Sequence, residues 1–575
     1  MPASIHAART VYELLHASAA VHAEGIALTY LDDVAPLSIS RQLSYAELFA
    51  ELNRTVRLIH DLAGKPRPVV SLLLPHLPQS QCLLWGAACA GVANPLNPLL
   101  NEDALYGLML KAETDLIFVL GPVPGSDLWD KARAVAERLP RRPSCVAVAM
   151  PAGELCYDRL LADYSPEPLA EHLLPAPQDT AAYFHTGGTT GLPKLARHSH
   201  ANQVAAALAY VRSLRVGPDD VAINGLPLFH VAGALVNSLG GLAGGVRLVL
   251  PTPAGFRNPE VIRQHWHLVE RFGVTVSGGI PTSVAAMLDV PLDGHDIGTL
   301  RFLLSGGAPV SAALCESVRA VTGLQLYQAY GMTEAAGVIA LPNLDAPAIP
   351  GSAGHIAAPI EVRIDGGEIC VRGPTVFPGY LGQDTPPLDD GWLRSGDLGH
   401  LDEHGNLFIT GRAKDLIIRG GHNIDPSLIE SCLERHPAVS LVAAVGMPDE
   451  YAGELPVAFV QLRPGCTATA EELQTYALAH IAERPACPKR IFLVDSLPVT
   501  TVGKIFKPQL REQAAASLFG ERALAHCGAL GVRVSQAGDG ALELRLSGVP
   551  ADRRDWCVAL ARDLNLRLMN LDAQG

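Results

Sequence analysis

One segment of the chain concentrates the residue types that proteins use to hold phosphate groups. It reads 183-YFHTGGTTGLPKLA-196, where glycines and threonines are interleaved and one lysine, Lys194, follows them. Backbone N–H groups at consecutive glycines can line a concave anion site, threonine hydroxyls add donors, and the lysine adds charge. The segment is not a Walker A motif, because two residues separate Gly191 from Lys194 and a leucine follows the lysine. It indicates either a phosphate loop of another kind or a glycine-rich hairpin turn with exposed threonines.

Two later segments carry groups that suit the rest of a nucleotide. In 327-YQAYGMTEAAGV-338 an aromatic ring, a hydroxyl and a carboxylate follow one another. They suit a base, a phosphate and Mg²⁺, since Mg²⁺ takes few carboxylates together with substrate oxygens. In 391-GWLRSGDLGHLDEHGNLFITGRAKDLIIRGGHNI-424, Asp397 can accept from ribose hydroxyls and Arg412 can contact phosphate or ribose. Considered alone, the first of these segments is explained equally well by a turn with exposed polar residues, and Asp397 and Arg412 are better explained as a surface salt bridge or turn residues.

A fourth segment, 498-PVTTVGKIFKPQL-510, places Lys504 after a glycine in a threonine-rich loop. A lone lysine in a loop is ordinarily solvated, so this segment alone does not indicate chemistry. Four such segments in this order are a much stronger pattern than any one of them. We therefore interpret them together.

The four segments together resemble those of the adenylate-forming (AMP-binding) superfamily, in its acyl-CoA synthetase and fatty-acid–CoA ligase branch. The resemblance covers about residues 10 to 510. The segments 226-LPLFHVAGAL-235 and 305-SGGAPVS-311 also look like the family's acyl-pocket and adenine-side segments. The matching patterns are T-G-G-T-T-G-x-P-K, Y-G-M-T-E, G-W-x-x-S-G-D, G-R-x-K-D and P-x-T-x-x-G-K.

The resemblance implies how ATP would be held. The glycine-rich loop would hold the β- and γ-phosphates, Tyr330 would stack on adenine, and Asp397 with Arg412 would take the ribose hydroxyls. Two further glycines would line the path of CoA. The implied ATP- and CoA-binding residues are Thr186, Gly187, Gly188, Thr189, Thr190, Gly191, Lys194, Gly307, Ala308, Pro309, Tyr330, Gly331, Met332, Asp397, Arg412, Gly420 and Gly421.

The resemblance also implies the reacting groups. Lys504 would bridge the acyl carboxylate and the α-phosphate, which are two anions that must approach each other. Thr333 would contact phosphate, and Glu334 would bind Mg²⁺. His230 would line or gate the acyl pocket, with a packed, hydrogen-bonded histidine as the alternative. Neither formation of an acyl-AMP nor its attack by a thiol needs a covalent enzyme nucleophile. Both reactions need positioning and charge stabilisation.

The implied reaction has two steps that use one active site in turn. A carboxylic acid and ATP would give acyl-AMP and pyrophosphate, and the thiol of CoA would then displace AMP. Lys414 in 411-GRAKD-415 matches the family's hinge, about which a small C-terminal domain rotates. After that rotation Gly420 and Gly421 would face the site and leave room for the thin pantetheine arm.

The sequence indicates less about which carboxylic acid is activated and which thiol accepts the acyl group. The segments 232-AGALVNSLGGLAGG-245 and 278-GGIPTSV-284 are small and apolar, and we expect them to leave volume for a medium or long acyl chain or an aryl group. No cation is evident for a second carboxylate, so a monocarboxylic acid is expected. The closest alternative acceptor is a carrier-protein phosphopantetheine, and a luciferase-like oxygenase shares the first step. A non-catalytic nucleotide-binding scaffold is the alternative from another class, which the intact Lys194, Glu334 and Lys504 argue against.

Composition limits the other functions that the protein can have. The chain has 575 residues, of which 48% are hydrophobic and 18% charged, so it is globular and too long for one core. A formal net charge of −14 argues against a nucleic-acid partner and against docking on anionic membranes. The apolar runs 69–78 and 83–96 fall short of the ~20 residues that span a bilayer, and no signal peptide is evident.

The eleven cysteines are scattered without a C-x-x-C pattern. We interpret them as mostly buried, reduced thiols in a cytoplasmic protein, with a zinc site or disulfide framework as the alternative. The expected partners are therefore a small carboxylic acid, ATP and CoA. A homo-oligomer is compatible with the sequence.

Alternating strand-like and helix-like segments predict an α/β fold with parallel sheets. Strands are expected at 69–74 and 116–120, and helices at 77–93 and 126–140. The expected N-terminal domain, residues 1–413, contains two parallel-sheet α/β subdomains and a small β-rich subdomain with a hairpin in 361-EVRIDGGEICVRG-373. A mobile α/β domain, residues 414–515, would carry Lys504.

An extension at residues 516–575 has no counterpart in the resemblance. Strands are expected at 531–536 and 542–546, joined by a turn at Gly538-Asp539-Gly540. An amphipathic helix is expected over 550–568, with Trp556, Leu560 and Leu564 on one face. A packing or subunit-contact role for this extension is a hypothesis.

Overall fold

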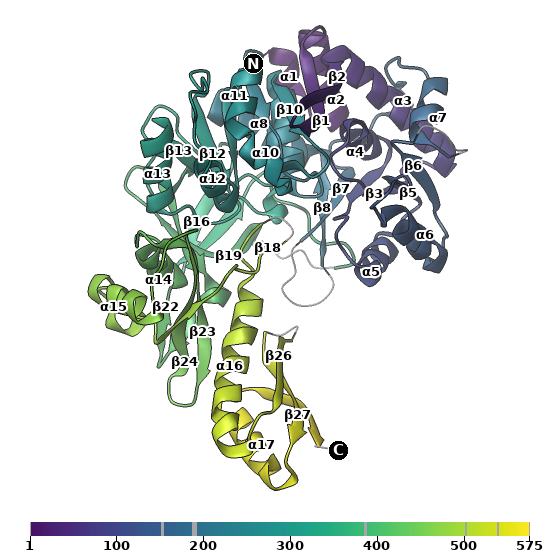
Figure 1. The fold of residues 1–575 in the computed structure, drawn as a ribbon. Coiled ribbons are helices and arrows are strands. Elements are labelled where there is room, and N and C mark those ends of the chain that lie inside the picture. The colour runs from purple at the N-terminus through teal and green to yellow at the C-terminus, as the bar shows by residue number, and fades with distance from the viewer. Residues whose placement is uncertain are drawn as a thin grey trace.

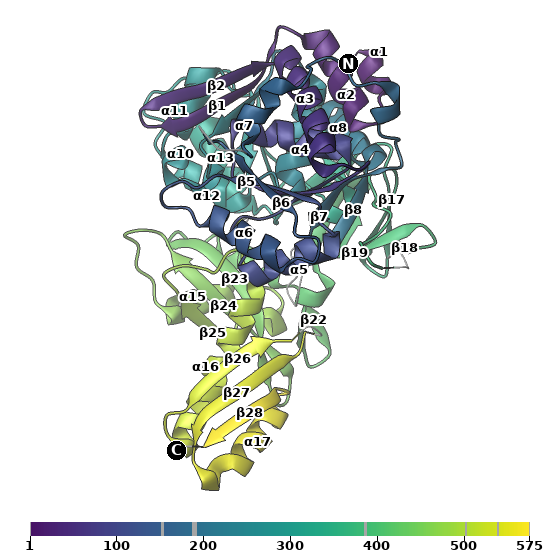
Figure 2. The same ribbon diagram turned by 90° about the vertical axis from the view of Figure 1, so that its right-hand side faces the viewer.

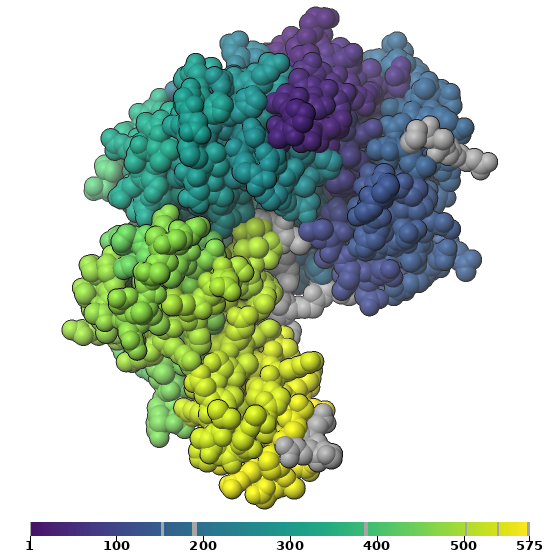
Figure 3. Space-filling view, in the orientation of Figure 1, coloured from purple at the N-terminus to yellow at the C-terminus, as the bar shows by residue number. Residues whose placement is uncertain are grey.

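The computed structural model describes residues 2–150, 155–186, 193–383, 388–500, 503–537 and 540–573. They form a large N-terminal body, a smaller domain that follows it, and a terminal α/β unit (Figure 1). In the space-filling view the terminal unit extends beyond the smaller domain and away from the body (Figure 3). The predicted fold class is confirmed.

The first of two mainly parallel sheets has six strands in the order β6-β5-β3-β4-β7-β8. Its β7 and β8 are antiparallel, and the other neighbours are parallel. The predicted strands at 69–74 and 116–120 are confirmed as β3 and β5. The strands are β3 (Val69–Leu73), β4 (Val92–Pro95), β5 (Leu116–Leu120), β6 (Ser144–Val148), β7 (Thr180–His185) and β8 (Leu195–Ser199).

The second sheet has seven strands in the order β13-β12-β11-β9-β10-β1-β2. All neighbours are parallel except the β1–β2 ribbon, which the sequence did not predict. The strands are β1 (Ile26–Val34), β2 (Leu37–Ser44), β9 (Val221–Ile223), β10 (Arg247–Pro251), β11 (Val276–Gly279), β12 (Phe302–Gly306) and β13 (Leu326–Ala329).

Helices between these sheets form the largest core. Helix α4 (Pro78–Ala90) buries 11 of its 13 residues, because it is apolar or small on every side and has protein around it. Helix α8 (His200–Leu214) begins directly after β8, where the Ser199 side chain accepts from the Asn202 N–H and caps the helix. The other helices of the body are α1 (Ala3–Ala7), α2 (Val11–His22), α3 (Tyr45–Ala63), α5 (Glu102–Ala112), α6 (Leu128–Arg138), α7 (Tyr157–Leu160), α9 (Gly240–Gly244), α10 (Pro259–Arg263), α11 (His265–Phe272), α12 (Pro281–Leu288) and α13 (Ala312–Thr322).

A β-rich subdomain completes the body, as predicted. Its seven strands follow the order β14-β15-β20-β19-β17-β16, with β18 beside β19. The predicted hairpin is present, since Asp365 pairs with Glu368 and the two glycines between them have positive φ. The strands are β14 (Ala340–Leu341), β15 (Ser352–Ile356), β16 (Glu361–Asp365), β17 (Glu368–Arg372), β18 (Leu388–Asp389), β19 (Trp392–Leu401) and β20 (Asn406–Arg412).

The smaller domain is a second α/β unit. Its sheet has the order β22-β21-β24-β23, with β25 beside β24. Helix α16 (Lys507–Cys527) packs on this sheet and continues without a break into the terminal unit. The other elements are β21 (Ile417–Arg419), β22 (His422–Ile424), α14 (Pro426–Leu433), β23 (Val439–Asp449), β24 (Gly453–Leu462), α15 (Ala470–His480) and β25 (Arg490–Leu493).

The terminal unit contains a three-stranded sheet, β26-β27-β28, with α17 (Arg554–Asp563) and the end of α16 packed on it (Figure 2). The predicted strands are confirmed as β26 (Gly531–Gln536) and β27 (Leu542–Val549); Gly538 and Asp539 lie outside the described residues. The predicted helix to residue 568 is wrong at its end. The chain takes a left-handed conformation at Asn565 and then forms β28 (Arg567–Ala573), which pairs in parallel with β27.

All eleven cysteines are free thiols, and seven of them are buried, as predicted. Within the described ranges, no helix combines the length and apolar character required to cross a bilayer.

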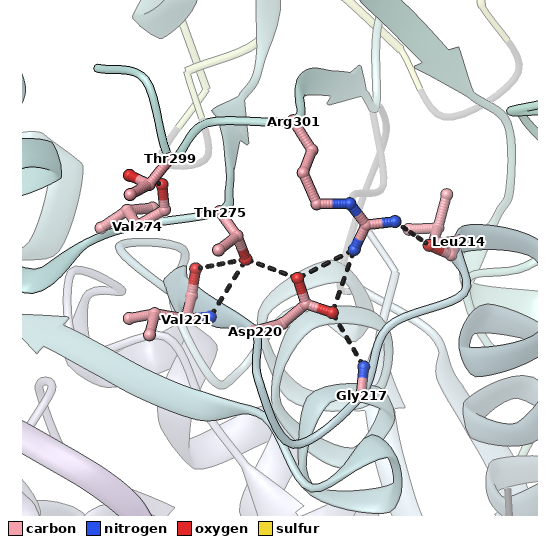
Figure 4. Close-up of polar contacts among 8 residues, drawn as sticks. All are labelled: Leu214, Gly217, Asp220, Val221, Val274, Thr275, Thr299 and Arg301. Carbon is pink, nitrogen blue, oxygen red and sulfur yellow. Dashed lines mark hydrogen bonds and ion pairs between the residues drawn. The ribbon is translucent and has the colours of Figure 1, made fainter. Parts of the chain in front are cut away.

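An ion pair between a buried carboxylate and a partly exposed guanidinium joins the starts of parallel strands in the second sheet (Figure 4). Asp220 precedes β9 and accepts from Arg301, which precedes β12, at 2.8 Å. Its carboxylate also accepts from the Thr275 hydroxyl at 2.6 Å and from the Gly217 N–H at 2.8 Å. Arg301 donates in turn to the Leu214 carbonyl at the end of α8. One carboxylate therefore fixes three connections at the edge opposite the carboxyl ends of the strands.

Asp220→Ala is expected to lower the free energy of unfolding of the body by about 2 kcal/mol, because it removes the buried acceptor of the hydrogen bonds from Arg301, Thr275 and Gly217. The midpoint of thermal unfolding measures this loss. Asp219→Ala, which removes the exposed neighbouring carboxylate, is the control. Equal midpoints for the two variants would contradict the assignment.

Candidate active site

Several predicted nucleotide residues lie at the carboxyl ends of β12 and β13. Gly307 follows β12 with φ +81°, a conformation that favours glycine, and Ala308 and Pro309 follow it. Tyr330 follows β13, and its N–H donates to the Ala340 carbonyl at 2.9 Å. A Cβ on Gly331 would lie 2.1 Å from the carbonyl oxygen of Gly337, so only glycine fits there. The two loops therefore meet at the edge where parallel sheets bind ligands.

Tyr330, Asp397 and Arg412 form a hydrogen-bonded group. Asp397 and Arg412 are paired in the β19–β20 ladder, and Arg412 Nε donates to Asp397 Oδ1 at 2.8 Å. The Tyr330 hydroxyl donates to Asp397 Oδ2 at 2.7 Å. Asp397 is 4% exposed, and burial together with this carboxylate raises the pKa of Tyr330. Each carboxylate oxygen retains a lone pair that can accept a further hydroxyl.

Glu334 is connected to the phosphate-loop lysine through a tyrosine. Glu334 is buried in a short 3₁₀ turn, Thr333–Ala335, and accepts from the Tyr380 hydroxyl at 2.6 Å. Lys194 Nζ lies over the Tyr380 ring, 4.8 Å from its centroid. Sequence reasoning missed Tyr380, because an aromatic residue after a Pro-Gly pair indicates only a turn.

The base of the phosphate loop is fixed by the β7–β8 hairpin. His185 pairs with Leu195, and the Thr186 N–H donates to the Lys194 carbonyl at 2.9 Å. Gly187, Gly188, Thr189, Thr190 and Gly191 lie outside the described residues. On β8, His198 Nε2 lies 2.7 Å from the Thr333 carbonyl, so the strand after the loop also holds the turn that carries Glu334. Beside that turn Met332 packs against the cluster around Phe377.

The smaller domain places Lys504 against this group. A Cβ on Gly307 would lie 3.2 Å from Lys504 Cε. Burial and Arg412 lower the pKa of Lys504, while Asp397 and Glu334 act in the opposite direction. The loop is closed by the Thr500 N–H, which donates to the Lys504 carbonyl at 2.6 Å. Lys504 therefore shares one site with residues that precede it by about ninety positions or more.

His230 lies at the same place and is uncharged. Its Nδ1 accepts from the Ala232 N–H at 3.2 Å, which leaves the ring hydrogen of the neutral form on Nε2. Burial lowers the pKa of His230 to about 3, and Lys504 and His185 add to the shift. The neighbouring His185 ring stacks on Phe229, with centroids 5.8 Å apart. His230 can therefore line the site as a neutral hydrogen-bonding group.

Gly420 and Gly421 are not brought to this site. They form the turn between β21 and β22, both with positive φ and with no neighbouring atom within 4 Å of an added Cβ. Gly420 lines a surface pocket of the smaller domain beside Tyr451 and Arg484, none of which belongs to the nucleotide group. Lys414 lies between the two domains in a 3₁₀ turn, and its carbonyl accepts from Arg511 at 3.4 Å.

The expectation that small residues leave volume for the acyl group is wrong for several glycines. An added Cβ on Gly233 would lie 2.3 Å from the Pro227 carbonyl oxygen. Beyond Gly240 and Gly241, the space holds the side chains of Tyr210 and Leu248, 2.7 and 2.8 Å from an added Cβ. These glycines allow helices and strands to pack closely; they do not enlarge a pocket.

The donor set fits a metal that arrives with phosphates. In the part of the chain that the structure describes, no three His, Cys, Asp or Glu residues cluster as a metal site would require. Glu334 supplies one buried carboxylate, which suits Mg²⁺ bound by few protein ligands together with phosphate oxygens.

In the comparison with known proteins, the N-terminal body and the smaller domain each match a family model. Residues 15–381 match the family model described as AMP-binding enzyme, and residues 428–504 match the AMP-binding enzyme C-terminal domain. The chain is 35% identical over 536 residues to the marinolic acid–CoA ligase of Pseudoalteromonas sp. (strain SANK 73390), covering 88% of this chain and 81% of that one. It is 31% identical over 507 residues to the fatty acid–[acyl-carrier-protein] ligase ScoC of Streptomyces coeruleorubidus, covering 83% and 93%.

A solved structure supports the same comparison. The crystal structure of ATP-bound MatB from Rhodopseudomonas palustris superposes with a TM-score of 0.78 at 27% identity, covering 88% of this chain and 98% of that one.

Tyr330→Phe is expected to weaken ATP binding about tenfold, because it removes a hydrogen bond to a buried carboxylate. Calorimetric titration with ATP measures the change in Kd. Tyr327→Phe is the matched control, since the Tyr327 hydroxyl donates to the Ala346 carbonyl at 3.1 Å outside the group. An unchanged Kd for Tyr330→Phe would show that the hydrogen bond to Asp397 does not support the nucleotide.

Proposed function

This chain belongs to the AMP-binding enzyme family and is an ATP-dependent acid–CoA ligase, and we propose that its acid is a monocarboxylic fatty or aryl acid. The observation that supports the mechanism best is the placing of Lys504 beside Asp397, Arg412 and Glu334. A scaffold without catalysis has no need for a lysine from a second domain at the nucleotide site.

The first step joins the acid to AMP. A carboxylate oxygen attacks the α-phosphorus of ATP, and the bond to pyrophosphate breaks. Lys504 lies between the two anions and offsets their repulsion, and bound anions favour its charged form. We assign phosphate contacts to Thr186, Lys194 and Thr333. Asp397 accepts from the ribose hydroxyls while Arg412 and Tyr330 hold its carboxylate in place.

Glu334 would hold Mg²⁺, which supplies positive charge to the phosphates when bound. Tyr380 keeps one oxygen of Glu334 occupied and so orients the carboxylate. The neutral His230 positions the acyl group without adding charge.

The second step transfers the acyl group to a thiol. The sulfur of CoA attacks the acyl carbon, AMP leaves with the bonding electron pair, and the thiol proton passes to solvent. We propose that residues 414–515 rotate about Lys414 between the steps, which withdraws Lys504 and brings Gly420 and Gly421 to the site. The 516–575 extension would move with them, because α16 spans the boundary between the two parts.

A carrier-protein phosphopantetheine is the second candidate acceptor, and the similarity to ScoC favours it. Both acceptors present the same thiol-bearing arm, so residues of the active site alone do not distinguish them. The extension follows both family matches along the chain.

The experiment that tests the function is release of AMP from ATP across a panel of acids, from short aliphatic to long-chain and aryl, each with and without CoA. We expect one class of monocarboxylic acid to give CoA-dependent AMP release. Exchange of pyrophosphate into ATP without CoA-dependent turnover would point to a carrier-protein acceptor. No turnover with any acid would overturn the proposed function.

Lys504→Ala is expected to slow formation of acyl-AMP by about 100-fold or more, yet to spare thioester formation from supplied acyl-AMP. The physical reason is that its charge is needed only while carboxylate and α-phosphate approach. Each half-reaction is measured separately, with Lys111→Ala as a control for loss of an exposed lysine. Equal loss of both half-reactions would contradict the proposed rotation.

A further inference from the structure

Two cysteines face each other in the terminal unit. Cys527 is the last residue of α16, and Cys557 lies in the first turn of α17. Their sulfur atoms are 3.9 Å apart. Among the described residues, this is the pair of thiols whose sulfurs come within hydrogen-bonding range.

The residues around the pair hold it in place. His526 and Trp556, which precede the two cysteines, stack with ring centroids 4.5 Å apart and planes at 16°. Both helices also pack on β26–β28 through a shared core that includes Phe519 and Leu560. Two consecutive side chains of α16 therefore meet two consecutive side chains of α17, so the approach of the sulfurs is supported by packing on both sides.

The two thiols differ in how accessible they are. Cys527 is partly exposed, whereas Cys557 is fully buried. Burial and the neighbouring Cys527 raise the pKa of Cys557 to about 11. Because Cys527 is the more accessible thiol, it is the one that meets a reagent from solvent first. Its thiolate is the attacking species in thiol–disulfide exchange.

We propose that Cys527 and Cys557 form a modification site at which a low-molecular-weight disulfide, such as oxidised glutathione, creates an intramolecular disulfide. The Cys527 thiolate attacks one glutathione sulfur and releases one glutathione thiolate. The Cys557 thiolate then attacks the Cys527 sulfur and releases the second. The two protons lost by the cysteines end on the two glutathione thiolates. The protein dithiol is oxidised and glutathione disulfide is reduced to two thiols.

The geometry permits this bond with small movements. A disulfide requires sulfur atoms about 2 Å apart, so the two sulfurs must approach from 3.9 Å. The residues are 30 positions apart, so the bond would close a loop that contains β26 and β27. It would tie α17 to α16, which also packs on the smaller domain through Leu510 and Ala514. This inference does not depend on the proposed function.

The test treats the reduced full-length protein with oxidised glutathione and locates every cysteine by peptide mass mapping without reduction. We expect a linked Cys527–Cys557 peptide and loss of two hydrogen atoms from that pair, reversed by dithiothreitol. The exposed Cys466 should gain a glutathione, which shows that the reagent is active. Wild-type protein in which Cys466 reacts while Cys527 and Cys557 stay unmodified, or in which Cys527 retains glutathione, would overturn the proposal.

Two variants test the order of attack. Cys557→Ala should stop at a mixed disulfide between Cys527 and glutathione, because the resolving thiol is missing. Cys527→Ala should leave Cys557 as a free thiol, because that side chain is buried. Stable glutathione on Cys557 in the second variant would contradict the order. The wild-type result stands by itself if either variant fails to fold.

Discussion

Asp397 is a carboxylate that is 4% exposed, and the cost of burying its charge determines what must surround it. Arg412 and Tyr330 each supply one hydrogen bond, and they come from different parts of the body. Arg412 belongs to the β-rich subdomain, whereas Tyr330 follows β13 of the second parallel sheet. Because the Asp397 carboxylate takes hydrogen bonds from both parts, it holds the edge of the second parallel sheet against the β-rich sheet. Lys504 brings the smaller domain to the same charge.

This constraint explains why the active site depends on domain position. Lys504 and the turn at Gly420 and Gly421 are carried by one small domain, yet only Lys504 reaches the nucleotide group in this structure. Since the smaller domain is held together by its own core, the Gly420–Gly421 turn cannot approach the nucleotide group without Lys504 moving as well. In the proposed rotation about Lys414, a single chain would present a cation for one step and a backbone turn for the next.

The structure brings Tyr330, Asp397 and Arg412 together as the sequence led us to expect, because each lies in a short segment with a local pattern. Asp397 and Arg412 are 15 positions apart, and a strand pairing brings them together. Tyr380 was missed because its role depends on Glu334 and Lys194, which are 46 and 186 residues away, and no local pattern encodes that meeting. The small glycines near residue 240 were misinterpreted for a related reason. The absence of a side chain does not say whether a neighbour fills the space, and here Tyr210 and Leu248 do.

The sequence did not predict strand β28 of the terminal unit. This unit is also coupled to the domain that carries Lys504. Periodicity alone extended α17 to residue 568, because a pattern of apolar residues does not encode the left-handed turn at Asn565 that ends the helix. More important is α16, where Ala514 packs into the core of the smaller domain and Ala515 into the core of the terminal unit. Leu518 contacts both cores. Two cores that share one helix over adjacent residues must move as one body, so any rotation that withdraws Lys504 also moves the sheet β26–β28.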